Sequence, residues 1–400
     1  MAALARRGGA VATSSTASER TRLGSCLSRL RPAAAAAPCE LALSSGIVEK
    51  YSSQVSMKNS VADDVALERS LRDNSHAVAA ASARVVPVID LASANAADAM
   101  WEAATTVGFF TLKNHGLPQE LVDAAFQNSS EFFARPRAEK DADSPFARDM
   151  NSGYEFMSQV RPSTGTADQK ESLQVTAREG AMDGRWPSAP AALEPSVRAL
   201  LDAGHALACR VVSLLEPRAC PSLPPGTLAA AHRLWGDDGQ CTLRLLHYPP
   251  TAPVDPAATG PRLWRAGPHT DWCCVTLLFQ RPGEAGLECA ANPRAAGAAG
   301  TAPAAWAPVE PVEGGIAVNV GDMLSRWSDG RLLSNLHRVR MPLPEEAGGA
   351  DGLSPSRYSI AFFLQADKRA LIKSETHDEI TAGDYILGRI RSNFAGGAGE

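Results

Sequence analysis

Seven short β-type runs follow one another after residue 238, and they constrain the fold more than any other feature. The runs are rich in β-branched and aromatic residues, and Pro-, Gly- and Ala-rich turns separate them. Because no helical pattern lies between them, they predict an antiparallel sandwich or jelly roll. They are residues 241–250, 272–280, 286–290, 306–312, 315–322, 336–342 and 357–365.

The chain before residue 238 combines strands with helices. Residues 83–91 and 109–116 predict strands, and the second ends in Asn-His-Gly, which suits a turn with positive φ. We therefore expect an α+β fold in which helices flank the jelly-roll core. Apolar residues recur at helical spacing in four segments, residues 93–108, 118–136, 194–219 and 379–394.

Composition and charge exclude several classes of protein. Apolar residues make up 44% of the chain and charged residues 21%, which is globular. The net charge of -5, without a Lys/Arg tract, argues against a nucleic-acid partner. No apolar run approaches the roughly 20 residues that span a bilayer. The eight cysteines form no C-x-x-C pair, so we expect a reduced, intracellular protein.

The first eighty residues differ from the rest. Residues 1–40 contain six arginines and two acids, are rich in Ala and Ser, and lack the apolar core of a secretory signal. This is typical either of an organelle transit peptide or of a disordered tail without an address. The protein would accordingly be cytoplasmic, or organellar in a plastid or mitochondrion. Residues 41–80 are polar and predict disorder or a loose helix.

Four parts of the chain follow from these patterns. They are a disordered N-terminal extension over 1–80, a helical and strand part over 81–235, the jelly-roll core over 236–370, and a C-terminal helix and tail over 371–400.

A histidine and an aspartate two residues apart suggest a metal site. On a strand, His269 and Asp271 would point to the same face and converge on one ion. His337 is the best third ligand, because it lies in a β-type run of the same region. Two histidines and one carboxylate form the facial triad of non-haem Fe(II) oxygenases, which leaves coordination positions open. Alone, however, the H-x-D spacing arises often by chance.

An arginine and a serine two residues apart strengthen the metal hypothesis. Arg357 and Ser359 would share one face of the last core strand, and a guanidinium beside a hydroxyl binds carboxylates. A surface salt bridge is the alternative role for Arg357. Because Arg357 opens an apolar run, an inward-facing guanidinium would need a buried anionic partner. Triad and receptor together imply an oxoacid that chelates iron at one end and meets the arginine at the other.

Over residues 84–394 the sequence resembles the 2-oxoglutarate- and Fe(II)-dependent dioxygenases of the isopenicillin N synthase-like group. The resemblance rests on VPVIDL, VGFFTLKNHGL, LRLLHYPP, PHTDWCCVTLLFQ, GIAVNVGDML, LHRV and RYSIAFF. It implies a cupin-like double-stranded β-helix. It also implies that His269, Asp271 and His337 bind iron, with no catalytic residue beyond these ligands, and that Arg357 and Ser359 bind the far carboxylate of 2-oxoglutarate.

Further roles follow from the resemblance. Tyr248 matches the tyrosine that helps hold the keto-acid end. Fe(II), 2-oxoglutarate and O2 are the implied cofactor and co-substrates, with ascorbate as a stimulant. Oxidative decarboxylation to succinate and CO2 would drive hydroxylation, desaturation or ring closure of a small molecule, in secondary metabolism. We expect a monomer with no membrane partner. Phe279, Asn319 and Phe363 are candidates for the substrate pocket, although core packing explains them equally well.

Three departures from the family pattern stand out. Leu246 replaces the asparagine that many plant members have two residues before the tyrosine. Arg357 follows His337 by twenty residues, a longer interval than usual, and we expect the extra loop over 343–356 to leave strand register intact. Cys273 and Cys274 follow the H-x-D motif, and we expect small buried strand residues there.

Four other histidines and one aspartate receive structural roles. We expect His115 to be a turn and packing residue, His247 to point away from the pocket, and His205 and His232 to be structural or exposed. Asp322 is expected to fix a turn. Residues 152–165 are candidates for the mouth of the pocket.

Three other functions remain open on sequence grounds. One is an oxidase of the same group that uses no 2-oxoglutarate, such as isopenicillin N synthase or the ethylene-forming oxidase of plants. Another is a non-catalytic binding module that keeps the fold as a sensor. The third is a zinc hydrolase built on H-x-D and a distal histidine, in which the Arg357/Ser359 pair would have no purpose.

Overall fold

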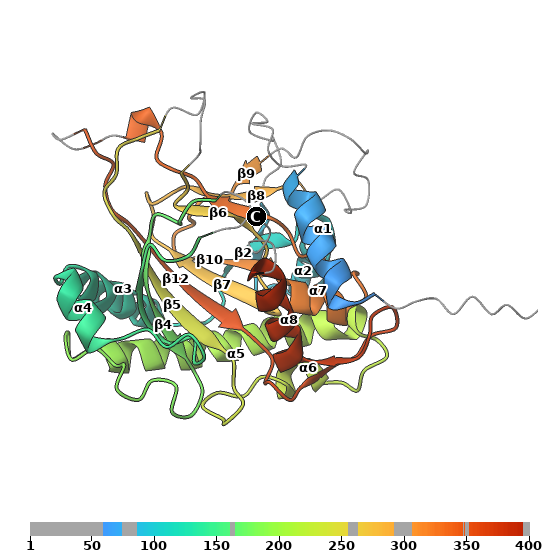
Figure 1. Cartoon of the computed structure of the whole chain (residues 1–400). Coiled ribbons are helices and arrows are strands. Elements are labelled where there is room, and N and C mark those ends of the chain that lie inside the picture. Colours follow the sequence, from blue (N-terminus) through green and yellow to red (C-terminus); the bar gives the residue numbers. More distant parts are fainter. Residues whose placement is uncertain are drawn as a thin grey trace, which may run out of the picture. The chain divides into compact units, whose positions relative to one another are not determined.

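Two β-sheets pack against each other and share a hydrophobic cluster that includes Tyr248 and Ala361 from one sheet and Leu287 and Val339 from the other. The computed structural model describes residues 59–73, 86–160, 165–254, 263–291, 306–346, 348 and 352–394. Figure 1 shows the strands of the small sheet, β6, β8 and β9, beside those of the large one.

The large sheet contains eight strands in the order β1-β2-β10-β7-β12-β5-β4-β3. All neighbours in it are antiparallel except β1 and β2. Its strands are β1 (Val88–Asp90), β2 (Phe109–Lys113), β3 (Gly153–Phe156), β4 (Glu171–Thr176), β5 (Thr242–Tyr248), β7 (Val275–Gln280), β10 (Ile316–Val320) and β12 (Arg357–Leu364).

The small sheet has the order β6-β11-β8-β9, and a further two-stranded sheet joins β13 to β14. These strands are β6 (Ala266–His269), β8 (Leu287–Ala290), β9 (Trp306–Pro308), β11 (His337–Val339), β13 (Leu371–Ile372) and β14 (Ile380–Thr381). A short 3-10 helix covers Pro344–Glu346.

Helices cover the face of the large sheet that points away from the small sheet. The main core joins α2, α3 and α5 to alternate strand residues such as Leu245, Phe279 and Ile360, and α5 runs along the sheet in Figure 1. The helices are α1 (Val61–Asp73), α2 (Ala96–Thr106), α3 (Gln119–Phe133), α4 (Arg137–Asp143), α5 (Leu193–Ala219), α6 (Thr227–Ala230), α7 (Asp322–Trp327) and α8 (Ala382–Phe394).

The predicted α+β fold with a jelly-roll core is confirmed. The four expected helices are α2, α3, α5 and α8, and the Asn-His-Gly turn has positive φ at Asn114 and Gly116. Five strands escaped the sequence patterns, namely β3, β4, β6, β13 and β14. Strands β3 and β4 lie in the part where helices dominate. They pair with β5, so the N-terminal part and the core share one sheet.

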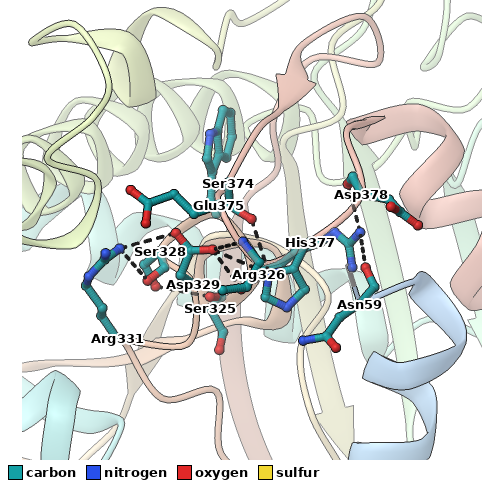
Figure 2. Close-up of polar contacts among 12 residues, drawn as sticks. Asn59, Ser325, Arg326, Ser328, Asp329, Arg331, Ser374, Glu375, His377 and Asp378 are labelled. Atoms are coloured by element: carbon teal, nitrogen blue, oxygen red, sulfur yellow. Dashed lines mark hydrogen bonds and ion pairs between the residues drawn. The ribbon is translucent and has the colours of Figure 1, made fainter. Parts of the chain in front are cut away.

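Helix α1 belongs to the folded unit, so the expectation of a disordered extension over 1–80 is wrong for residues 59–73. The helix packs on α8. Asp64 forms an ion pair of 2.8 Å with Arg326, whose guanidinium also donates to the carbonyls of Asn59 and Asp378 (Figure 2). Arg326 is 2% exposed, and these acceptors from both ends of the chain satisfy its buried charge. Residues 1–58 and 74–80 of the expected extension lie outside the described residues.

Two further observations concern membrane-spanning helices and cysteines. Among the helices in the described ranges, none is both long and apolar enough to cross a membrane. The six cysteines in the same ranges are free thiols.

Candidate metal centre and co-substrate site

The three predicted metal ligands meet at one end of the small sheet. His269 is the last residue of β6, Asp271 follows two residues later, and His337 is the first residue of β11. The strands β6 and β11 are antiparallel neighbours, and their register places His337 directly opposite His269. The local H-x-D pair and the distal histidine are therefore brought together by one strand pairing.

The ligand atoms are close enough to share one ion. Oδ1 of Asp271 lies 3.8 Å from Nε2 of His269 and 3.6 Å from Nε2 of His337. All three ligand atoms lie within 4.8 Å of one another. The separations to Oδ1 are too long for hydrogen bonds, but they suit donors that each lie about 2 Å from a common metal.

Backbone carbonyls set the tautomers of both histidines. Nδ1 of His269 donates to the Gly267 carbonyl at 2.7 Å, and Nδ1 of His337 donates to the Asn335 carbonyl at 3.3 Å. With the proton held on Nδ1, the neutral ring presents its lone pair at Nε2. These nitrogens are the two that lie beside Oδ1 of Asp271. The donor set therefore fits a cation that takes nitrogen and carboxylate ligands.

Two neutral donors orient the carboxylate of Asp271. The Thr276 hydroxyl donates to Oδ2 at 2.6 Å, and the Asn319 amide donates to the same oxygen at 2.8 Å. Both bonds occupy Oδ2, so Oδ1 is the oxygen presented to the histidines. Asn319 was expected in the substrate pocket, but the structure gives it this contact with the aspartate. Sequence alternation places it on the inner face, although no sequence signal links it to Asp271.

Charged side chains from α1, α7 and α8 support the loop that carries the metal ligands. Thr270, which lies between His269 and Asp271, donates to Asp322 at 2.9 Å. Arg389, only 1% exposed, pairs with Asp322 at 2.7 Å and with Glu68. Asp322 fixes the turn as expected, because its backbone N–H also donates to the Asp271 carbonyl at 2.7 Å. The role of Arg389 was missed, since nothing in the sequence marks a buried arginine in the last helix.

Arg357, Ser359 and Tyr248 lie together on the inner face of the large sheet. Arg357 is opposite Tyr248 in the register of β12 and β5, and its Cζ lies 4.9 Å from the Tyr248 ring centroid. The guanidinium donates to the Ser359 hydroxyl at 3.4 Å, to the Glu284 carbonyl at 2.9 Å and to the Gln280 side chain at 3.2 Å. The predicted same-face arrangement of Arg357 and Ser359 is confirmed.

The charge of Arg357 meets only neutral acceptors within the described part of the chain. The side chain is 2% exposed, and no carboxylate of the described residues lies within ion-pair distance. A buried cation without an anion is costly unless a ligand supplies the opposite charge. The arrangement is therefore suited to binding a carboxylate from outside the chain.

Two models of known protein families match the chain, one in its N-terminal part and one in its core. A model of the 2OG-Fe(II) oxygenase superfamily matches residues 239–366. A second model, which describes the N-terminal region of the non-haem dioxygenase in morphine synthesis, matches residues 86–191. The 2-oxoglutarate-dependent dioxygenase frbA of Dothideomycetidae sp. is 34% identical over 289 residues, which cover 67% of this chain and 79% of frbA.

The chain belongs to the 2-oxoglutarate- and Fe(II)-dependent dioxygenases.

Another relative and one solved structure agree with this assignment, and a second solved structure shares the fold. The 2-oxoglutarate-dependent dioxygenase htyE of Aspergillus rugulosus is 30% identical, with 71% of this chain and 87% of htyE covered. A Neurospora crassa protein solved in complex with alpha-KG and 5-formyluracil has a TM-score of 0.62 at 25% identity, with 78% and 97% covered. The dioxygenase for auxin oxidation in rice shares the fold, with a TM-score of 0.58 at 22% identity and 77% and 96% covered.

This dioxygenase is thus an oxidoreductase that uses Fe(II), 2-oxoglutarate and O2. Its predicted fold, a double-stranded β-helix flanked by helices, is the fold of the solved oxygenases.

The departures from the family pattern alter contacts without disturbing the fold of the dioxygenase. Leu246 lies on the inner face opposite Ser359, so an apolar side chain stands where many plant members have an amide. The longer loop before β12 leaves the pairing of Arg357 with Tyr248 intact, as expected. Cys273 and Cys274 are fully buried, and burial raises the pKa of both thiols well above the usual value. They therefore stay neutral near pH 7, as small packing residues do.

The prediction that Phe279 lines the substrate pocket is wrong. Its side chain is 1% exposed and belongs to the core between the large sheet and the helices. Side chains alternate along β7, so Leu278 and Gln280 share the inner face while Phe279 points outward. Phe363, in contrast, packs on the inner cluster, 5.3 Å from Cζ of Arg244.

Four histidines outside the triad make structural contacts. His115 bonds the Gly314 carbonyl, and His205 bonds the His232 carbonyl. His247, opposite in direction to Tyr248 as expected, pairs with Glu171 at 2.6 Å. His232 lies just beyond α6 rather than in a helix and is 2% exposed.

Proposed function

We propose that His269, Asp271 and His337 hold the Fe(II) of this dioxygenase, and that Arg357 and Ser359 bind the far carboxylate of 2-oxoglutarate. The observation that carries the proposal is the convergence of the three ligand atoms within 4.8 Å, with both histidine tautomers and the aspartate already oriented. Tyr248 lies against the Arg357 guanidinium and completes the co-substrate site.

The chain's own residues would bind the metal at one end of the inner face and the far carboxylate of 2-oxoglutarate at the other. Fe(II), when bound, supplies the activation of dioxygen that is coupled to decarboxylation of 2-oxoglutarate. The two Nε2 atoms and Oδ1 of Asp271 would hold the metal, while Thr276 and Asn319 keep that carboxylate fixed. Arg357 would neutralise and orient the far carboxylate, and the burial of the site excludes water from it.

The substrate we propose is a small organic molecule that approaches from the side of β3 and β4. A shallow depression lies there, and four residues of the segment expected at the mouth, Glu155, Met157, Ser158 and Gln159, line it. The polar lining favours a substrate with hydrogen-bonding groups at its end away from the metal. It is lined by Glu155, Met157, Ser158, Gln159, Asp168, Lys170 and Ser172. Hydroxylation, desaturation and ring closure are all within the chemistry of such a site.

Several finer features of the protein rest on its sequence. We propose that it acts as a monomer without a nucleic-acid or membrane partner. It would work in the cytoplasm, or in a plastid or mitochondrion if its first residues form a transit peptide. Residues 81–235, 236–370 and 371–400 would be the N-terminal part, the core and the C-terminal segment.

Anaerobic titration with Fe(II) and 2-oxoglutarate tests the metal and co-substrate assignment. Wild-type protein should develop a metal-to-ligand charge-transfer absorption band, and His269→Ala should abolish it. His115→Ala is the matched control, because His115 bonds a carbonyl away from the triad and should leave the band intact. Absence of the band in wild-type protein, or its persistence in His269→Ala, contradicts the assignment.

Turnover and metal measurements distinguish the dioxygenase from the oxidase, sensor and hydrolase alternatives. A screen of small molecules for stimulated decarboxylation of 2-oxoglutarate should identify substrate classes and show succinate release. Turnover without 2-oxoglutarate would indicate the co-substrate-independent oxidases, and no succinate with any compound would indicate a sensor. Metal analysis after native purification distinguishes iron from the zinc of a hydrolase.

A further inference from the structure

A second buried arginine, Arg265, lies beside the proposed co-substrate site. It immediately precedes β6, the strand that ends in His269, and it is 6% exposed. Its Nη2 donates to the Pro355 carbonyl at 3.2 Å and to the Ser354 hydroxyl at 3.4 Å. Its Nε atom has no hydrogen-bond partner within the described residues. A buried guanidinium is thus held by one of its nitrogens while another donor stays unused.

Arg265 and Arg357 approach the same aromatic ring. Cζ of Arg265 lies 5.9 Å from the Tyr248 ring centroid, and Cζ of Arg357 lies 4.9 Å from it. Burial, followed by repulsion from Arg357, lowers the pKa of Arg265 to about 10. Arg265 remains charged near pH 7, and two buried guanidinium groups thus face one tyrosine.

The two charges lack a counter-ion in the described part of the chain. No carboxylate there lies within ion-pair distance of Arg265 or Arg357. Glu346, whose charge acts on Arg265, is itself bound to Arg340 by two bonds of 2.7 Å. Bringing two like charges together in a buried site is unfavourable unless an anion binds both. An anion that enters from solution would bind both cations and remove this cost.

The position of Arg265 in the chain and its hydrogen-bond partners place it near the proposed site of the far carboxylate of 2-oxoglutarate. Its partners Ser354 and Pro355 lie three and two residues before Arg357, so Arg265 contacts the segment that leads into β12. Four residues of extended chain, about 13 Å, separate Arg265 from His269 along β6. The guanidinium thus belongs to the end of the site away from the metal ligands.

We propose that Arg265 is a second carboxylate-binding residue, which forms with Arg357 a paired-guanidinium receptor for the far carboxylate of 2-oxoglutarate. The inference rests on the proposed function of Arg357. A purely structural role would need only the two bonds of Nη2, which a neutral donor supplies without the cost of a buried cation. The unused Nε donor and the absence of a carboxylate partner among the described residues argue for a ligand.

Equilibrium binding of two oxo acids tests the proposal. The probes are 2-oxoglutarate and 2-oxopentanoate, which lacks the far carboxylate, each titrated anaerobically into Fe(II)-loaded protein and followed by the charge-transfer absorption. Arg265→Met should weaken 2-oxoglutarate binding by about tenfold or more, because a charge-assisted hydrogen bond is lost. Binding of 2-oxopentanoate should stay unchanged, and Arg265→Lys should recover part of the loss.

Two further variants separate the possible outcomes. Ser354→Ala removes a neighbour of Arg265 but keeps the cation, so it should affect neither oxo acid. Equal weakening of both acids by Arg265→Met, or matching effects of Arg265→Met and Ser354→Ala, would show a structural role and overturn the proposal. A third outcome would also overturn the proposal: Arg265→Met leaves 2-oxoglutarate binding unchanged but raises the KM for the organic substrate that the enzyme oxidises. That result would place an anionic group of this substrate at Arg265.

Arg357→Met distinguishes failure of this inference from failure of the proposed function. If Arg357→Met weakens 2-oxoglutarate binding and Arg265→Met does not, only the second receptor residue is wrong. If neither variant weakens binding, the carboxylate site itself is misassigned. Thermal unfolding of each variant checks that the fold is retained.

Discussion

The side-chain amide of Asn319 on β10 donates a 2.8 Å hydrogen bond to Oδ2 of Asp271, in the loop between β6 and β7. It shares that oxygen with the Thr276 hydroxyl and leaves Oδ1 directed at the two histidines. These two bonds orient the carboxylate, which reduces the cost of organising the site on metal binding.

Replacing Asn319 should therefore weaken iron binding. We expect Asn319→Ala to lower Fe(II) affinity by about tenfold to a hundredfold, since it removes a bond that orients a ligand. Competition between the protein and a calibrated chelator measures this. Gln127→Ala, on the exposed side of α3, is the control and should bind iron like wild type. An unchanged affinity in Asn319→Ala would show that Thr276 alone holds the carboxylate.

Arg357 should be intolerant of lysine. The guanidinium reaches Ser359, Gln280 and a backbone carbonyl at once, and an ammonium lacks the planar fork needed for these bonds and a bidentate carboxylate. Arg357→Lys should raise the KM for 2-oxoglutarate by about tenfold or more. Arg369→Lys, at an exposed ion pair, should leave it unchanged. A normal KM in Arg357→Lys would argue against bidentate binding.

Helix α1 should contribute to stability through Glu68. Its carboxylate pairs with Arg389, which is buried and also holds Asp322 near the metal loop. Glu68→Gln leaves the arginine with one anion fewer, so we expect a loss of about 1–3 kcal/mol in the free energy of unfolding. Urea denaturation measures this, with the exposed Glu102→Gln on α2 as control. Equal stability of both variants would mean that α1 adds little to the fold.

His232 should make the protein less stable in mild acid. Burial lowers the pKa of this histidine to about 4, below the ordinary 6.5. Between these values the unfolded chain binds a proton that the folded chain does not, so stability is full above about pH 6.5 and falls as the pH drops toward 4. The full loss in the free energy of unfolding from this one group is about 3 kcal/mol.

The variant His232→Gln removes this titration. The loss of unfolding free energy between pH 7 and pH 4.5 should be smaller in the variant than in wild type by about 2 kcal/mol. Denaturant unfolding at both pH values measures it. If wild type and variant lose the same amount, other groups dominate the acid sensitivity.

Relations within a single strand were accessible from the sequence. Arg357 with Ser359 follows from a spacing of two residues on β12, because side chains alternate along a strand. His269 and Asp271 were paired by the same argument, but His269 ends β6 and Asp271 lies in the loop that follows it. His337 was chosen because it lay in a β-type run of the same region, and the pairing of β11 with β6 places it beside His269. The family resemblance drew these separate motifs into one site.

Other relations required the tertiary structure. The pattern of β7 shows which residues share a face but not which face is inward, because the large sheet has apolar clusters on both sides, and Phe279 was assigned to the wrong one. The bond between Asn319 and Asp271 joins residues 48 positions apart, and the pair of Glu68 with Arg389 joins residues 321 apart. Neither leaves a local pattern.

The sequence by itself determined the strand-rich core, the flanking helices and the chemistry of the metal and carboxylate motifs, since these depend on local spacing and residue type. Only the tertiary structure decided which face is the inner one, that α1 joins the fold, and that Arg265 meets Arg357 at Tyr248. Such contacts depend on strand register and on the balance of buried charge, and both are set by residues distant in the chain.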